Sequence, residues 1–389
     1  MKIAILGGTF DPIHNGHLHI AKLAADAFAI DKVLFIPTGH PPHKACPFAN
    51  GRHRLHMTQL AIESDPRFAV SDLEVFRDGT TYTIDTLRTL HDELHHVHWH
   101  YIIGADTLAV LDSWREFDQV CKMCSFIVAL RPGNKIREVE LNIARMMKYG
   151  ADIHVLDAFG PDISSTTIRS RAAQGESLAG LVPEKVAAYI DQYHFYQNAL
   201  LRDAILNWLR QNLSLKRYRH VLGVEHSAVS LAMRYGADEN QASLAALLHD
   251  CAKEFDFQTL CEVVKRVGLD DPDFAFAPHL MHAPAGSIFA REHFGVTDEA
   301  ILHAICVHTL GCDHMSLLDK ILFLADVIEP SRCFDGVEKL REAAFHNLDQ
   351  SCLMAARGTM IDTLRKNSFL HPQTVRTYNH LLIHDQEER

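Results

Sequence analysis

Short apolar runs alternate with helical patterns over the first half of the chain. Six runs rich in aliphatic and β-branched residues predict buried strands, at 2–6, 32–36, 67–72, 98–104, 125–130 and 152–156. Apolar residues at helical spacing fill most of the segments between them. Strands that alternate with helices are typical of an α/β fold with a doubly wound parallel sheet. Ligands of such sheets bind beyond the carboxyl ends of the strands.

The strand pattern stops near Asn198, and helical spacing then continues almost to the end of the chain. Clear examples are the segments 202–213, 239–250 and 317–329. We therefore predict two domains in the 389 residues, an α/β domain at 1–197 and an all-α domain at 198–389. The polar residues after Asn379 are expected to fray.

Composition and charge narrow the class of protein. The net charge is −11 and no long basic run is present, so we expect no affinity for bulk nucleic acid. No segment approaches the about 18 apolar residues of a membrane span, and the first apolar run is too short for a signal peptide. We therefore expect a cytoplasmic protein without a membrane anchor, whose nine cysteines are reduced. Histidine is the one residue type that is unusually frequent, with 27 residues in the chain.

The segment GGTFDPIHNGH, from Gly7 to His17, follows the first predicted strand. Gly7 and Gly8 allow a sharp turn and a close approach of the backbone to a ligand. His14 and His17 stand three residues apart at the start of a helix that we expect to begin near Gly16, so they share a face. A helix N-terminus offers unpaired N–H groups and a positive dipole end. The segment therefore predicts an anion site with two imidazoles, suited to the phosphates of a nucleotide.

A second motif, ISSTTIR, runs from Ile163 to Arg169. Ser164 or Ser165 is expected to cap a helix, and Arg169 stands about one turn further along. Such a run alone indicates only a helix cap. Together with the first motif, it predicts a second anion site and hence a triphosphate substrate.

The two motifs resemble those of the HxGH nucleotidyltransferases, and the first half resembles nicotinate mononucleotide adenylyltransferase. The resemblance implies transfer of AMP from ATP to nicotinate mononucleotide, with deamido-NAD and pyrophosphate as products and Mg²⁺ as cofactor. It implies that His17 stabilises the transition state at the α-phosphate with help from His14. Arg169 and the serine-capped helix would hold the pyrophosphate, and Lys44, in the PPHK segment, is a further phosphate-binding candidate.

Three further features resemble the nicotinate-nucleotide branch of that superfamily. The TYT segment that ends at Thr83 opens a helix, which suits a nicotinate carboxylate, and GAD at 104–106 follows a strand. Trp114 offers a plate on which a pyridine ring can stack, and Arg131 begins the RPG segment. These features argue against the alternatives for this half, a pantetheine-phosphate adenylyltransferase or a cytidylyltransferase. The residues assigned to nucleotide binding by the resemblance are Gly7, Gly8, Thr9, Phe10, Thr83, Gly104, Asp106, Trp114, Arg131, Ile163, Ser164 and Ser165.

In the second half, the pair His249-Asp250 ends an apolar helical segment. One such pair is weak evidence, but four more histidine and aspartate residues accompany it in order. The set resembles the ligands of the HD phosphohydrolase superfamily, and most of 216–333 resembles the bacterial HD-domain diadenosine tetraphosphate hydrolases. The resemblance implies symmetrical cleavage of diadenosine tetraphosphate to two ADP by a two-metal site. Its implied metal ligands are His220, His249, Asp250, His282, His308 and Asp326.

Mixed imidazole and carboxylate ligands suit two iron or manganese ions better than a structural zinc ion. Lys253, Arg332 and Arg219 are candidate phosphate contacts. One departure from the resemblance is Ala283, where glycine is expected after His282. Two alternatives stay open for this half: another HD nucleotide phosphohydrolase, or a module that senses a nucleotide without turnover. A homo-oligomer also stays open.

Overall fold

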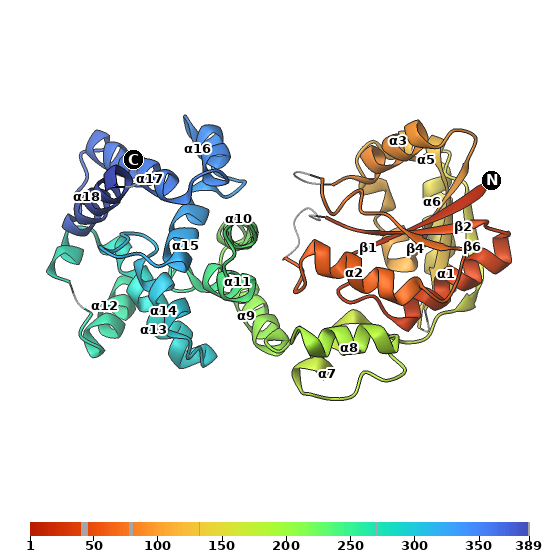
Figure 1. Cartoon of the computed structure of the whole chain (residues 1–389), viewed down its shortest axis with the longest axis horizontal. Helices are drawn as coiled ribbons and strands as arrows, with labels where there is room; N and C mark the ends of the chain where they lie inside the picture. Colours follow the sequence, from red (N-terminus) through yellow and green to blue (C-terminus); the bar gives the residue numbers. More distant parts are fainter. Residues whose placement is uncertain (40–45, 78–80, 132, 270, 388–389) are drawn as a thin grey trace. The chain divides into compact units, whose positions relative to one another are not determined.

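The computed structural model describes residues 1–39, 46–77, 81–131, 133–269 and 271–387. The chain divides into two compact units, one ending at Leu200 and the other beginning at Leu201. We call them the α/β unit and the helical unit (Figure 1).

Six parallel strands form the centre of the α/β unit. They are β1 Lys2–Gly8, β2 Lys32–Pro37, β3 Phe68–Val70, β4 His98–Gly104, β5 Ser125–Leu130 and β6 Ile153–Phe159. Their order is β3-β2-β1-β4-β5-β6, and the strand order reverses between β1 and β4. The predicted doubly wound sheet and all six strands are confirmed. β3 is shorter than predicted because it lies at an edge and pairs with β2 alone.

Helices cover both faces of the sheet (Figure 1). One face packs against α1 Asn15–Phe28, α2 Gly51–Ile62, α7 Ser165–Ala173 and α8 Glu184–Gln192, and the other against α3 Thr83–Glu93, α5 Phe117–Met123 and α6 Ile136–Met147. The short α4 Ala105–Leu108 and the 3₁₀ helix η1 Leu111–Ser113 follow β4. β1 shows the sequence basis, since Ala4 and Leu6 enter one hydrophobic cluster while Ile3 and Ile5 enter the other. Burial on both faces explains why the strands are apolar without alternation.

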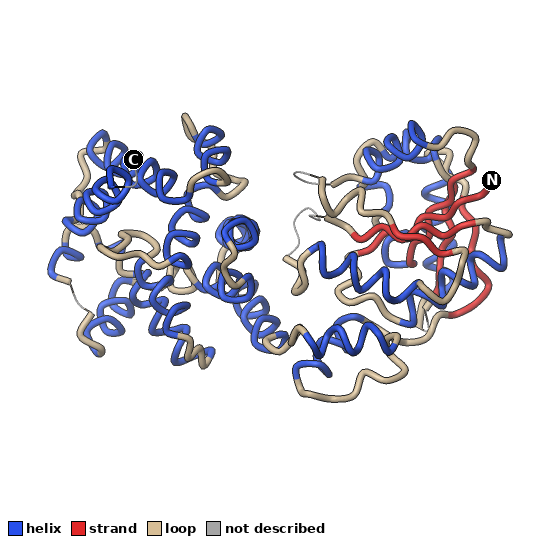
Figure 2. Tube along the Cα trace, in the orientation of Figure 1, coloured by secondary structure: helices blue, strands red, loops and turns tan. Residues whose placement is uncertain are grey.

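In the helical unit, the described residues form helices and loops only (Figure 2). The helices are α9 Ala199–Asn212, α10 Leu215–Tyr235, α11 Glu239–Leu248, α12 Phe257–Arg266, α13 His282–Phe294, α14 Glu299–Val307, α15 Leu317–Ile328, α16 Val337–Ala344, α17 Leu348–Arg365 and α18 Pro372–Glu387, with 3₁₀ turns η2 Pro272–Ala275 and η3 Pro278–Leu280. The predicted all-α region is confirmed. The prediction that the chain frays after Asn379 is wrong, because α18 continues to Glu387 and packs against α17.

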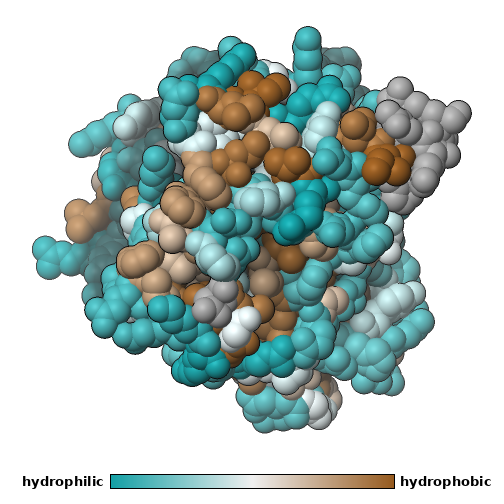
Figure 3. Space-filling model, turned by 90° about the vertical axis from the view of Figure 1, so that its left-hand side faces the viewer, coloured by the Kyte–Doolittle hydropathy of each residue, from teal (hydrophilic) through white to brown (hydrophobic). Residues whose placement is uncertain are grey.

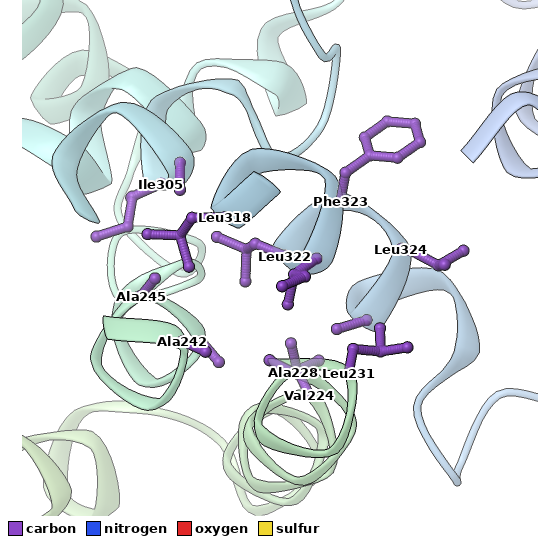
Figure 4. Close-up of a cluster of buried hydrophobic side chains, with 14 of the residues drawn as sticks. Val224, Ala228, Leu231, Ala242, Ala245, Ile305, Leu318, Leu322, Phe323 and Leu324 are labelled. Atoms are coloured by element: carbon purple, nitrogen blue, oxygen red, sulfur yellow. The ribbon is translucent and has the colours of Figure 1, made fainter. Parts of the chain in front are cut away.

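The helix α15 forms the centre of the helical core (Figure 4). Its Leu318 and Leu322 lie among side chains of α10 and α11, including Val224 and Ala245. Residues are buried on nearly every side of α15, so its apolar content is not confined to one stripe. This packing fixes the helix that carries Asp326.

Among the described helices, none combines the length and the apolar content needed to cross a membrane. The face of the molecule drawn in Figure 3 is largely hydrophilic, with hydrophobic side chains in separate groups.

We predict that Leu322→Ala destabilises the helical unit by about 2–5 kcal/mol, because Leu322 is 1% exposed and its truncation leaves a cavity. Leu364→Ala is the matched control, since Leu364 is 59% exposed, and it should change stability by less than about 0.5 kcal/mol. Urea unfolding followed by far-ultraviolet circular dichroism measures both. Equal shifts for the two variants would contradict the assigned core.

Candidate functional site

Two stacked histidines begin α1. His14 is the N-cap, and its Nδ1 accepts a hydrogen bond from the backbone N–H of His17 at 3.3 Å. In return, Nδ1 of His17 accepts from the backbone N–H of His14 at 3.2 Å, and the ring centroids are 3.6 Å apart. A backbone N–H can only donate, so each neutral ring carries its hydrogen on Nε2. Each imidazole therefore keeps an N–H donor for another partner.

Burial and a nearby cation keep these imidazoles uncharged. Burial, and then the positive charge of Arg131, lower the pKa of His14 to about 4. Burial, and then His14 and Arg131, hold the pKa of His17 well below its ordinary value. Arg131 directly follows β5, so the carboxyl end of that strand brings its guanidinium near the imidazole pair. At neutral pH the charge at this point is that of Arg131, and the imidazoles are neutral donors.

The second motif docks on the loop that precedes α1. Ser164, and not Ser165, is the N-cap of α7, where its Oγ accepts from the backbone N–H of Thr167 at 3.1 Å. The Oγ of Ser165 donates to the carbonyl of Pro12 at 3.0 Å. Ile163 lies against Gly16, where an added Cβ would approach the Ile163 side chain to 3.6 Å. The two predicted anion sites are therefore neighbours in the α/β unit.

Asp11 holds this loop together, and the sequence analysis missed it. Its Oδ1 accepts from the hydroxyl of Tyr196 at 3.0 Å and from the backbone N–H of Ala49 at 3.1 Å. Its Oδ2 accepts from the backbone N–H of Phe48 at 2.7 Å. Its backbone carbonyl accepts from Nη1 of Arg169 at 2.9 Å. The signal in the sequence was its place inside the first motif, between Phe10 and Pro12.

The turn between β1 and α1 is shaped by Phe10. Its backbone has a φ of 49°, in the left-handed region, and its ring meets His17 edge-on at 5.0 Å between centroids. A Cβ at Gly8 would come to 3.0 Å from the Phe10 ring, which explains the glycine. The buried Arg54 donates from Nη1 to the carbonyl of Thr9 at 2.6 Å. The residues 8–10 therefore support the imidazole pair through the backbone.

Tyr101 on β4 connects three residues that were predicted to surround the nucleotide. A Cβ at Gly7 would overlap the Tyr101 hydroxyl, and the Thr83 side chain lies near that hydroxyl. The indole of Trp114 meets the Tyr101 ring edge-on at 5.6 Å. Tyr101 itself was not predicted, because its place inside a strand indicated only core packing.

Three further predicted residues of this unit are Gly104, Asp106 and Lys44. Gly104 is the N-cap of α4, and the exposed Asp106 turns its carboxylate back toward Gly104, where a Cβ would overlap it. Lys44 lies outside the described residues.

In the helical unit, Asp250 lies at the centre of the predicted histidines. Its Oδ1 is 3.1 Å from Nε2 of His282. Its Oδ2 is 3.5 Å from Nε2 of His220 and 3.4 Å from Nε2 of His249. The two oxygens thus face different imidazoles, which is the arrangement that a carboxylate needs to bridge two metal ions.

All six predicted ligands belong to three overlapping groups in which the ligand atoms lie within 4.8 Å of one another. The groups are His220–His249–Asp250, His249–His308–Asp326 and Asp250–His282–His308. The structure therefore brings together residues that are up to 106 positions apart in the chain, from His220 to Asp326.

Three of these histidines direct Nδ1 toward a carbonyl three residues earlier. The distances are 2.6 Å from His249 to Ala246, 2.6 Å from His282 to His279 and 2.7 Å from His308 to Ile305. A carbonyl only accepts, so neutral His249 and His308 carry their hydrogen on Nδ1 and keep a lone pair on Nε2. His282 also faces Lys253, and its Nε2 lies 3.2 Å from Nε2 of His308. His249 and His308 are also the C-caps of α11 and α14, whose negative dipole ends favour a cation.

His220 is oriented by a carboxylate that the sequence analysis missed. Its Nδ1 is 3.0 Å from Oε1 of Glu329, which is 1% exposed. Its Nε2 is 3.1 Å from Oδ1 of Asp326. A carboxylate behind a histidine ligand fixes the ring and raises its basicity. The signal was present, because Glu329 follows Asp326 by three residues and so by about one helical turn.

Two buried nitrogens show that this donor set fits a metal. Nε2 of His220 and Nε2 of His249 have no hydrogen-bond partner within the described part of the chain, although the former is close to Asp326. A buried polar atom without a partner is costly unless something else binds it. Imidazole and carboxylate donors suit a divalent transition metal such as iron or manganese.

Cationic side chains surround the carboxylates of this cluster. Arg217, which was not predicted, donates from Nη1 to Oδ2 of Asp250 at 2.6 Å, whereas the predicted Arg219 is exposed. Arg332 pairs with Asp326, and Nζ of Lys253 is 3.3 Å from both ring nitrogens of His282.

The unexpected Ala283 is fully buried in α13, directly after His282. Because His282 keeps its contact with Asp250, the departure from glycine does not remove it from the cluster.

We predict that His14 makes the α/β unit sensitive to acid. Its pKa is about 4 when folded and 6.5 when unfolded, so the unfolded chain binds more protons between these values and stability falls as the pH falls. His14→Asn keeps a capping acceptor and removes this pH-dependent loss of folding stability. The loss amounts to up to about 2 kcal/mol at pH 5. Thermal melts at pH 7.5 and pH 5 test this, with exposed His19→Asn as control. The same acid sensitivity in wild type and His14→Asn would refute it.

Comparison with known proteins places both units. Residues 5–171 match the model of the cytidylyltransferase-like family, and residues 217–331 match that of the HD domain. Over 197 residues the chain is 39% identical to a probable nicotinate-nucleotide adenylyltransferase of Clostridium botulinum (strain Kyoto). This match covers 50% of this chain and 98% of that protein. A probable nicotinate-nucleotide adenylyltransferase of Leifsonia xyli is 41% identical over 197 residues, 51% of this chain and 94% of that protein.

Two solved structures are also similar. One is described as a predicted HD superfamily hydrolase involved in NAD metabolism from Clostridium acetobutylicum, with 40% identity and a TM-score of 0.46 over 47% of this chain and 97% of that chain. The other is Plasmodium falciparum nicotinic acid mononucleotide adenylyltransferase complexed with NaAD, with 21% identity and a TM-score of 0.43. This match covers 50% of this chain and 97% of that chain. Because relatives near 40% identity are covered almost completely, the chain belongs to the nicotinate-nucleotide adenylyltransferase family and carries an HD domain in addition.

Proposed function

We propose that the chain is a bifunctional enzyme with one activity in each domain. The domain at 1–197 transfers AMP from ATP to nicotinate mononucleotide and releases deamido-NAD and pyrophosphate. The domain at 198–389 hydrolyses diadenosine tetraphosphate with one water to two ADP. The imidazole pair at the start of α1 carries the first assignment, and the six-residue cluster around Asp250 carries the second.

Adenylyl transfer requires positioning and charge neutralisation more than a base. The phosphate of nicotinate mononucleotide is already ionised when it attacks the α-phosphate of ATP, and the bond to pyrophosphate breaks in line. The Nε2–H groups of His14 and His17 would donate to the α-phosphate, and Arg131 would add the fixed positive charge. Neutral donors suit this step because they bind the developing charge without giving up a proton.

The helix α7 would hold the pyrophosphate. Ser164 caps it, and Nε of Arg169 has no hydrogen-bond partner within the described ranges, so this cation keeps a donor for a phosphate. Mg²⁺ bound with ATP would neutralise part of the leaving charge. Lys44 remains a candidate contact.

The nicotinate end of the substrate would lie near Thr83 and Trp114. α3 begins at Thr83 without a side-chain cap, so its first N–H groups suit the nicotinate carboxylate. Trp114 is half-buried and rests edge-on against Tyr101, which leaves an indole surface for a pyridine ring. Gly7, Gly104 and Asp106 would complete the pocket at the carboxyl ends of β1 and β4.

In the second domain, His220, His249, Asp250, His282, His308 and Asp326 would hold two iron or manganese ions. When bound, such ions polarise a phosphate and activate water. The chain's own part is to orient the imidazoles through Glu329 and the helix-end carbonyls. Arg217, Lys253 and Arg332 would bind the remaining phosphates of a tetraphosphate, which offers several anionic groups to several cations.

The same cluster would also serve another HD phosphohydrolase, because metal chemistry does not select the nucleotide. A sensing module without turnover is the other alternative. The complete set of six ligands favours an enzyme, since it would hold the two metal ions that a hydrolase uses to activate water.

We predict that the full chain forms deamido-NAD and pyrophosphate from ATP and nicotinate mononucleotide. His17→Gln should lower kcat by about 100-fold or more, since it removes a donor to the reacting phosphate. His19→Asn, at an exposed position of the same helix, should retain activity. The assay includes nicotinamide mononucleotide as a competing substrate, which measures the preference for the nicotinate nucleotide. Full activity of His17→Gln would exclude the assigned role.

We predict that, with Fe²⁺ or Mn²⁺, the wild-type chain converts diadenosine tetraphosphate to ADP as sole product and that Asp250→Ala does not. Asp362→Ala, at an exposed position of α17, is the control. Turnover of a different nucleotide would favour the other HD hydrolases, and metal-dependent binding without turnover would favour the sensing module. Hydrolysis that survives in Asp250→Ala would contradict the assigned site.

A further inference from the structure

A second cluster of metal-ligating side chains lies in the helical unit, apart from the six residues of the proposed hydrolase. It joins α14, the loop 308–316 and the first turn of α15. His303, Cys312 and Asp319 each offer one ligand atom, and these atoms lie within 4.8 Å of one another. Neither the proposed adenylyl transfer nor the proposed hydrolysis uses any of them.

Asp319 is held as a ligand would be. Its Oδ2 accepts from the backbone N–H of Ser316 at 2.7 Å, as part of the capping box that begins α15. Its Oδ1 is 3.0 Å from Nδ1 of His303. The side chain of Asp319 is 1% exposed, whereas that of His303 is 51% exposed. The capping box therefore fixes a buried carboxylate with one oxygen turned toward the cluster, and His303 leaves a path for an ion to enter.

One thiol completes the cluster. Cys312 contributes the third of the grouped ligand atoms, and it does not form a disulfide. Imidazole, carboxylate and thiol donors therefore meet where α14, the loop 308–316 and α15 come together.

We propose that His303, Cys312 and Asp319 bind one Zn²⁺ ion. Zinc takes four ligands in a tetrahedron and accepts thiolate, imidazole and carboxylate donors together, and a water molecule can supply the fourth. The thiol separates this site from the cluster around Asp250, whose donors are nitrogen and oxygen only and suit iron or manganese. The proposal does not depend on either proposed activity.

Such an ion would connect two elements that carry ligands of the proposed hydrolase. The loop 308–316 begins at His308, and α15 carries Asp326. Zinc bound to Cys312 and Asp319 would tie this loop to the start of α15, while His303 would tie α14 to both. Its expected effect is therefore to stabilise the helical unit.

The test uses the full-length, reduced, metal-free chain titrated with Co²⁺, which takes the geometry of Zn²⁺ and shows thiolate ligands by an intense charge-transfer band in the near ultraviolet. Among the described residues, no thiol belongs to the Asp250 cluster, so a thiolate band does not come from that site. We expect the band in the wild type and in Asp250→Ala. We expect it to be lost in Cys312→Ser and unchanged in Cys333→Ser, an exposed cysteine of the same unit.

A second measurement guards against a variant that fails to fold. In the Asp250→Ala background, Zn²⁺ should raise the melting temperature, and the added substitution His303→Gln should weaken zinc affinity by at least about tenfold. The absence of a thiolate band in the cobalt-saturated wild type would overturn the proposal. A band that persists in Cys312→Ser would also overturn it, and would leave His303 and Asp319 as an ion pair only.

Discussion

The hydrogen bond that each site histidine makes through Nδ1 decides what its other nitrogen can bind. In α1, the Nδ1 atoms of His14 and His17 face backbone N–H groups, so the rings keep Nε2–H donors and suit a phosphate. In the helical unit, the Nδ1 atoms of His249 and His308 face helix-end carbonyls, so the rings keep Nε2 lone pairs and suit a metal. Histidine thus serves phosphate binding where Nδ1 faces a backbone N–H, and metal binding where Nδ1 faces a backbone carbonyl.

The helix ends reinforce this division. The imidazole donors of the α/β unit stand at a helix N-terminus, beside the N-terminus of α7, where dipoles favour anions. The imidazole acceptors of the helical unit include the C-caps of α11 and α14, where dipoles favour cations. Packing maintains both arrangements, since α11 and α14 pack against each other and against α15, and β1 delivers the first loop from the centre of a sheet.

The sequence predicted the elements well because apolar runs and helical spacing are local signals. It also predicted the imidazoles and aspartates that the structure brings together around Asp250, because they occur in the same order along the chain as the metal ligands of the HD superfamily. It did not predict Asp11, Tyr101 or Glu329, whose partners are distant in the chain, such as Tyr196 for Asp11 and His220 for Glu329. The sequence places Glu329 about one helical turn after Asp326, but its contact with His220 depends on the fold. The length of β3 and the end of α18 also depended on tertiary partners.

The most direct test of this account is a neutron crystal structure of the metal-free chain, in which the hydrogens on imidazole nitrogens are observed. We expect hydrogen on Nε2 and not on Nδ1 of His14 and His17. We expect hydrogen on Nδ1 and not on Nε2 of His249 and His308. The opposite tautomer in either pair would contradict the claim that helix-end backbone groups assign the imidazoles to phosphate and to metal.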